Sequence, residues 1–243
     1  MTNPIRLPKP GRVASVLLMV VGTLILLSLL GQVAKHVYGH TMLKGFVPAF
    51  YVDYESNVPT WYSSLALGLA AALLLMIACV HWQRKDTFRR HWAALTGLLL
   101  LLSADEVAMF HEYPIEPLRD TFQTGGVLYY PWVLPGIAFV ALVGIALARF
   151  FWHLPRPTQA HFLLAAVVFV SGAIGVEMLS GVQADRHGEE NLTYALIITV
   201  EESLEMLGVV IFIRGLVDYI HRELGGMSLQ VGSSNSDSLS QAA

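Results

Sequence analysis

Six long runs of apolar residues alternate with shorter polar segments along the chain. Each run is close to the ~20 residues that an α-helix needs to cross the hydrocarbon core of a bilayer. The pattern therefore predicts an all-α polytopic membrane protein, a bundle of six transmembrane helices that forms a single domain over residues 1–226. The expected helices cover residues 13–34, 61–82, 92–112, 131–152, 161–182 and 192–213.

Composition supports this class and excludes several others. Hydrophobic residues make up 55% of the chain and charged residues only 14%, and the mean hydropathy is +0.57. A soluble domain carries about 25% charged residues. The net charge of −3 lacks the basic excess of a nucleic-acid-binding protein. The single cysteine, Cys79, excludes a disulfide within the chain and any cysteine-rich zinc or iron–sulfur site.

Basic residues are shared unequally between the two sets of connections. Eleven of the fifteen Lys and Arg residues lie at one set of helix ends, together with both termini, whereas Lys35, Lys44, Arg119 and Arg186 lie at the other. Because Lys and Arg concentrate in cytoplasmic connections, we expect both termini in the cytoplasm and the protein in the bacterial inner (plasma) membrane. Membrane lipids are the expected partners, nucleic acid is not, and the oligomeric state stays open.

The two ends of the chain are interpreted differently. The first apolar stretch, residues 13–30, is longer than the roughly 7–15 residues of a signal peptide, and no A-x-A cleavage pattern follows it. We therefore expect a retained membrane anchor. Residues 227–243 are small and polar and predict a disordered cytoplasmic tail.

Acidic residues inside three of the predicted helices bear most directly on function. The third, fifth and sixth runs hold seven carboxylates and no Lys or Arg, and one histidine, His111, lies among these acids. Facing lipid, each ionised acid costs roughly 2.5–3.5 kcal/mol, and seven cost about 20 kcal/mol, more than the stability of a typical domain. We expect these side chains to face one another or water. The candidate site residues are Asp105, Glu106, His111, Glu112, Glu177, Glu201, Glu202 and Glu205.

Helical spacing predicts that these acids converge. At about 1.5 Å per residue, Asp105, Glu177 and Glu201 each lie roughly 8–15 Å from the outer end of their helix. Asp105 and Glu112 are seven residues apart and share a face of one helix, as Glu201 and Glu205 do on another. On an unbroken helix, His111 points about 120° away from Asp105. It joins the site only if the helix ends or bends before the proline that follows.

A divalent metal is the ligand that this residue set fits best. Carboxylates with a single imidazole suit hard or borderline cations, and we expect iron, manganese or zinc as the cofactor. The Glu-x-x-His motif of ferritin-like di-iron proteins and the HExxH zinc motif are both absent from the sequence. A metal-dependent enzyme that acts on a lipid or another apolar substrate follows as a hypothesis. The sequence identifies neither the reaction nor a catalytic residue.

Three alternatives use the same residues. A proton- or cation-coupled transporter would use the acids as relay or binding groups, but the apolar runs LGVVIFI and LTGLLLLL on the inner side favour a cup open to one side. A non-catalytic subunit or assembly factor of a membrane complex is the second alternative. Protonated carboxyls that only hold helices together are the third. Asp53 and Glu55 are interpreted as loop charges, with the lining of an entrance as the alternative.

Overall fold

A computed structural model describes residues 5–225 and 228–229 of the chain. Within these residues the protein is helical, apart from two two-residue strands that pair antiparallel near the ends of the described chain. The elements are β1 (Ile5–Arg6), α1 (Pro10–His36), η1 (Leu43–Gly45), α2 (Phe46–Phe50), α3 (Val58–Gln83), α4 (Arg89–Ala108), α5 (Ile115–Phe122), η2 (Gly126–Leu128), α6 (Val133–His153), α7 (Arg156–Val170), η3 (Ser171–Val176), α8 (Glu177–His187), α9 (Leu192–Glu223) and β2 (Ser228–Leu229).

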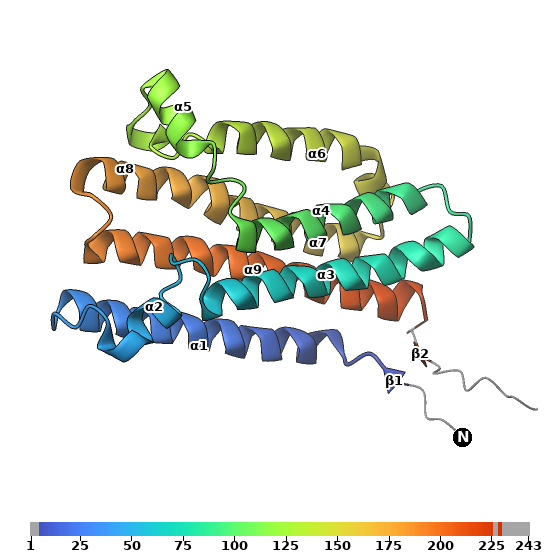
Figure 1. Cartoon of the computed structure of the whole chain (residues 1–243). Coiled ribbons are helices and arrows are strands. Elements are labelled where there is room, and N and C mark those ends of the chain that lie inside the picture. Colours follow the sequence, from blue (N-terminus) through green and yellow to red (C-terminus); the bar gives the residue numbers. More distant parts are fainter. Residues whose placement is uncertain (1–4, 226–227, 230–243) are drawn as a thin grey trace, which may run out of the picture.

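The long helices run side by side along one axis of an elongated molecule (Figure 1). The helices α7, η3 and α8 form one continuous segment, Arg156–His187. Among the residues that the structure describes, this segment and α1, α3 and α6 are the four helices that are long and apolar enough to cross a membrane. The other two long helices, α4 and α9, carry most of the candidate acids. The all-helical architecture with membrane-length apolar helices is therefore confirmed.

Three sequence expectations need correction or qualification. The third helix ends at Ala108, four residues before its expected end, and α9 continues ten residues beyond the expected end of the last helix. The two longest connections contain the short helices α2 and α5, which the apolar pattern did not predict. The expected disordered tail, 227–243, lies outside the described residues except for the two residues of β2.

Short polar signals fix where several helices begin. Asn57 precedes α3, and its Oδ1 accepts a hydrogen bond of 3.1 Å from the backbone N–H of Thr60. Asn191 precedes α9 and accepts in the same way from Tyr194 at 2.9 Å. Each Asn satisfies a backbone donor that the first helical turn leaves free. Both caps lie at the same end of the molecule as α2 and α5, which we call the loop end (Figure 1).

The last helix, α9, is the centre of the packing and contacts α1, α3 and α7. One apolar cluster joins α3, α4 and α9 away from the loop end and includes the buried residues Leu74, Trp92 and Ile213. A second cluster joins α1, α9 and the segment after α2, and includes Val52 and Ile198. The candidate acids of α9 lie between the loop end and the first of these clusters.

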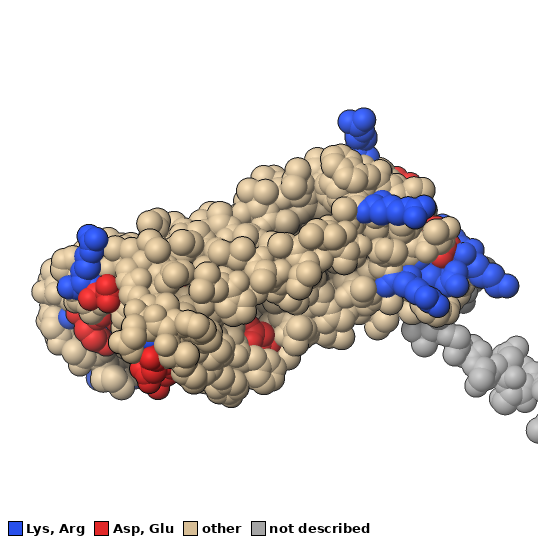
Figure 2. Space-filling model, turned by 90° about the horizontal axis from the view of Figure 1, so that it is seen from above, with Lys and Arg blue, Asp and Glu red and all other residues tan. Residues whose placement is uncertain are grey.

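The end opposite the loop end carries most of the basic residues. Figure 2 shows Lys and Arg gathered there, and a long surface between the two ends with few charges. We call it the basic end. The connection between α3 and α4 belongs to it and contributes Arg84, Lys85, Arg89 and Arg90.

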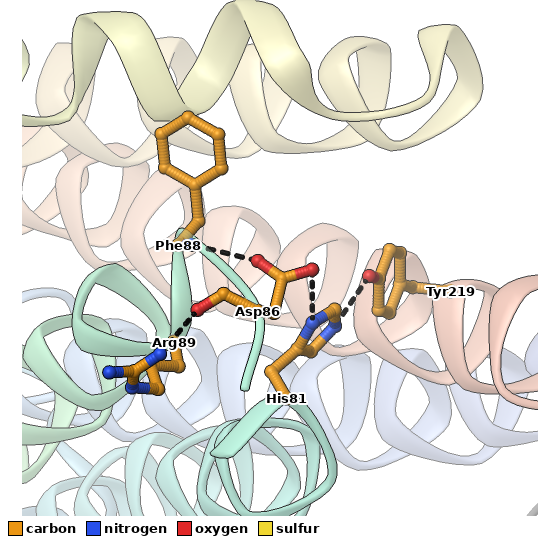
Figure 3. A network of polar contacts seen from close by, with 5 residues as sticks. All are labelled: His81, Asp86, Phe88, Arg89 and Tyr219. Atoms are coloured by element: carbon orange, nitrogen blue, oxygen red, sulfur yellow. Dashed lines mark hydrogen bonds and ion pairs between the residues drawn. The ribbon is translucent and has the colours of Figure 1, made fainter. Parts of the chain in front are cut away.

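A polar network ties three elements together at the basic end (Figure 3). His81 of α3 is buried, and its Nε2 lies 2.8 Å from the hydroxyl of Tyr219 on α9. Its Nδ1 lies 3.3 Å from Asp86, whose other carboxylate oxygen accepts from the backbone N–H of Phe88 at 2.7 Å. The hydrogen bond from Phe88 lowers the pKa of Asp86 below its usual value despite some burial, and His81 adds to this effect. These contacts fix the α3–α4 connection against α9.

Candidate functional site

The end of α4 is built around Asp105. The helix stops at Ala108 because Met109 adopts a left-handed conformation, with φ 54° and ψ 38°. The chain then folds back, so that the backbone N–H of His111 donates to Asp105 Oδ1 at 3.0 Å, and His111 Nδ1 lies 2.8 Å from Asp105 Oδ2. The helix therefore ends before Pro114, which is the condition under which His111 was expected to join the acids.

The same turn contradicts the expected position of Glu112. Because α4 ends before it, Glu112 does not share a helix face with Asp105, and it is exposed in the turn. His111 is only partly exposed. Burial lowers the pKa of its imidazole, but the hydrogen bond and charge of Asp105 outweigh that effect, and the pKa is raised above its usual value.

Trp132 links this turn to the fifth expected helix. It lies just before α6, and its ring centroid is 5.0 Å from that of His111. Its Nε1–H donates a hydrogen bond of 2.8 Å to Glu177 Oε1, at the start of α8. A chain of contacts therefore runs from Asp105 through His111 and Trp132 to Glu177.

Glu201 is the most deeply buried of the candidate acids on α9. Its exposed fraction is 5%, and its Oε2 has no hydrogen-bond partner among the described residues. Its charged neighbours are Glu177, Glu205 and Glu202. A buried carboxylate oxygen without a partner is costly, so Glu201 needs a proton, a water molecule or a cation from outside the chain.

A tight helix contact positions Glu177 relative to α9. The segment just before it, η3, is π-helical, a geometry often found at functional sites. Within η3, Gly172 is buried against α9, and a Cβ there would lie 2.8 Å from the backbone oxygen of Glu201 and 3.0 Å from Cγ of Glu205. Only glycine permits this approach without a shift of the backbone.

Glu106 and Glu205 belong to the wall of one small cavity. Both line it, together with Ser63 of α3 and apolar side chains. Its free volume is about 10 Å³, close to what one water molecule needs. The charged neighbours of Glu205 are Glu106, Glu177 and Asp105. Carboxylates of α4 and α9 therefore share the wall of one cavity, and Glu177 of α8 is a further charged neighbour of Glu205.

Two loop acids extend this group toward the loop end. Burial, followed by the charge of Glu189, raises the pKa of Asp53 to about 7, and Asp53 Oδ1 accepts from the hydroxyl of Tyr194 at 3.4 Å. Burial, followed by the charge of Glu112, raises the pKa of Glu55 to about 7. Glu55 Oε2 is buried without a hydrogen-bond partner among the described residues. Both residues are thus partly buried, and their interpretation as loop charges or as the lining of an entrance stays a prediction.

The chain matches a protein-family model over residues 13–220, which is most of its length. It belongs to that family, described as a domain of unknown function, DUF8692. The DUF8692 match includes every candidate site residue. No curated protein matches the chain, and no solved structure matches it.

The side chains of this DUF8692 protein are not arranged as a finished metal site. Among residues 5–225 and 228–229, no three His, Cys, Asp or Glu side chains lie close enough together to hold a metal ion. A cation would therefore have to draw the carboxylates toward itself by rotation of their side chains. The predicted metal site remains a prediction.

Proposed function

We propose that this chain is an integral membrane protein whose intramembrane carboxylates bind a divalent metal ion. In this proposal α1, α3, α4, α6, the α7–α8 segment and α9 are the six transmembrane spans. The positive-inside rule places the basic end, with both termini, in the cytoplasm of a bacterial inner membrane. The loop end then lies on the outer side.

The observation that carries the proposal is the unpartnered oxygen of Glu201. It is buried next to Glu177, Glu202 and Glu205, in a part of the bundle where the described chain offers no Lys or Arg as a counter-charge. Divalent cations satisfy several carboxylates at once. A proton shared between two carboxyls relieves the repulsion of that pair, so several protons would be needed for the acids that one divalent ion can contact together.

The donor set indicates which metals fit. Glu177, Glu201 and Glu205 supply oxygen ligands from two helices that Gly172 holds in close contact. Asp105, Glu106 and Glu202 are further oxygen donors, and His111 is the one nitrogen donor near them. Iron, manganese and zinc accept such mixed sets. Glu112, exposed beyond the end of α4, serves as an outer charge rather than as a ligand.

A bound divalent ion would supply Lewis acidity, or a metal-activated water, next to the apolar interior of the membrane. An enzyme acting on a lipid or another apolar molecule is the activity that this placement supports. The paired Asp105 and His111 would hold or move a proton beside it. Transport is the second candidate. The apolar cluster of α3, α4 and α9 lies between the acids and the basic end. It therefore favours a cavity that opens to one side over a channel through the bundle.

Elemental analysis tests the proposal. Protein purified in detergent, without chelator and without added metal, is compared with the double variant Glu201→Gln/Glu202→Gln and with the control Glu116→Gln, which changes an exposed acid of α5. We expect about one or two equivalents of metal per chain in the wild type and the control, and little in the double variant. Wild-type protein that stays metal-free after reconstitution with iron, manganese and zinc would contradict the proposal.

A further inference from the structure

A pocket of about 690 Å³ opens at the loop end, between α2 and the start of α3. Most of its wall is apolar or aromatic, and no Lys or Arg lines it. We call it the loop-end pocket. Its lining residues are Pro48, Ala49, Tyr54, Glu55, Ser56, Asn57, Val58 and Trp61.

Glu55 is the residue of this pocket that is free to bind a ligand. The side chain of Asn57 is already used, because its Nδ2 donates to the backbone oxygen of Tyr51 at 2.6 Å and its Oδ1 caps α3. The nearby cation Lys35 is paired with Glu190 at 2.5 Å. Glu55 Oε2, by contrast, is buried and has no partner among the described residues.

The charges around Glu55 lead from the pocket toward the candidate metal site. Among charged groups, Glu55 has the largest effect on Glu106 of α4. Glu106 in turn has the largest effect on Glu205 of α9. Glu55 of the α2–α3 connection, Glu106 of α4 and Glu205 of α9 are therefore successive charged neighbours. Glu55 lines the loop-end pocket, and the other two line the small cavity.

We propose that the loop-end pocket is the entrance through which divalent cations reach the buried acids, with Glu55 as their first carboxylate ligand. The proposal rests on the metal binding proposed above and adds the route and the residue that loads the site. Acids in a cleft with apolar walls focus the electric field and raise the local concentration of cations. A hydrated cation would exchange part of its water at Glu55, then pass to Glu106 and Glu205.

The test separates the rate of loading from the amount bound. Metal-free protein in detergent is mixed with Mn²⁺, and the loss of the free-ion electron paramagnetic resonance signal is followed for the wild type, Glu55→Gln and the control Glu116→Gln. We expect Glu55→Gln to load about tenfold more slowly and to reach the same saturating Mn²⁺ content. Glu116→Gln should load like the wild type. Equal loading rates for all three proteins would overturn the entrance and leave the metal site standing.

A second experiment blocks the pocket without altering Glu55. The one native cysteine, Cys79, is first replaced by serine, and a cysteine is then introduced at exposed Ser56 of the pocket or at exposed Thr121 of α5. A bulky, positively charged thiol reagent at Ser56→Cys should slow Mn²⁺ loading at least as strongly as Glu55→Gln, and at Thr121→Cys it should not. Unchanged loading after complete labelling at Ser56→Cys would overturn the entrance. Wild-type protein that binds no Mn²⁺ at equilibrium would overturn the metal site, and the entrance with it.

Discussion

Gly172 lies directly against the backbone of Glu201, and a Cβ at this glycine would come within 2.8 Å of the Glu201 carbonyl oxygen. The contact joins the π-helical segment before Glu177 to the most deeply buried acid of α9. It connects the packing of two helices with the spacing of the two carboxylates that they carry. Several consequences can be measured.

Gly172→Ala should destabilise the protein and weaken metal binding together. The added methyl group meets a backbone atom that cannot rotate away, and such overpacking costs about 1–3 kcal/mol. Thermal unfolding in detergent and the Mn²⁺ content measure the two effects. Gly175→Ala is the matched control in the same segment, because no atom lies within 4 Å of its Cβ position. Equal behaviour of the two variants would mean that the close contact does not position the acids.

Trp132→Phe should weaken metal binding while the protein stays folded. Phe keeps a ring beside His111 but loses the Nε1–H that donates to Glu177 at 2.8 Å. Loss of a hydrogen bond that orients a metal ligand lowers affinity by about 10- to 100-fold. Mn²⁺ titration gives the affinity, and Trp152→Phe, at a position that is 74% exposed, is the control. An unchanged affinity would remove Trp132 and Glu177 from the site.

Tyr219→Phe should lower stability without affecting the metal. The change removes the hydroxyl that lies 2.8 Å from His81 Nε2 and leaves a buried nitrogen unsatisfied, at a cost of about 1–3 kcal/mol. Tyr38→Phe, at a 70% exposed residue, should be neutral. A loss of bound metal in folded Tyr219→Phe protein would contradict this expectation. It would show that the basic end is coupled to the acids across the apolar cluster of α3, α4 and α9.

Asp53 should make stability fall as the pH rises. Its pKa is about 7 in the folded protein, first because of burial and then because of Glu189, and about 3.9 in the unfolded chain. Between these values the folded state holds a proton that the unfolded state releases, so the free energy of unfolding decreases with increasing pH. Glu55 acts in the same direction.

Asp53→Asn tests this pH dependence. Asn cannot ionise, so the variant should lose less stability than the wild type when the pH is raised from about 5 to about 8. The midpoint of thermal unfolding, measured in detergent at several pH values, provides the comparison. Parallel curves for the two proteins would show that Asp53 titrates normally in the folded state.

The sequence predicted the helices better than the ends of the helices. The apolar runs identified every long helix among the described residues, and four of these helices are long and apolar enough to cross a membrane. The end of α4 could not be derived from that pattern, because it depends on how Asp105 binds the folded-back backbone at His111. The proline at position 114 was the one sequence signal that a break was near.

Other features of the site depend on contacts between distant segments. The π-helical turn at η3 accompanies the fit of Gly172 against α9, which helical periodicity does not reveal. Glu55 lies in a connection with no apolar period, so spacing could not predict that it would be a charged neighbour of Glu106. By contrast, the acids of α9 could be identified directly, because ionisable residues in a long apolar run are rare and costly.

The proposal that the buried carboxylates bind a divalent metal ion is tested most directly by locating the ion in a crystal. Crystals of the wild-type protein soaked with Mn²⁺ would be measured at a wavelength where manganese scatters anomalously. We expect an anomalous peak between α8 and α9, within coordination distance of Glu201 and Glu177, and no such peak in Glu201→Gln/Glu202→Gln. Anomalous peaks confined to the protein surface, with the Glu201 carboxyl in contact with protein atoms or water alone, would contradict it.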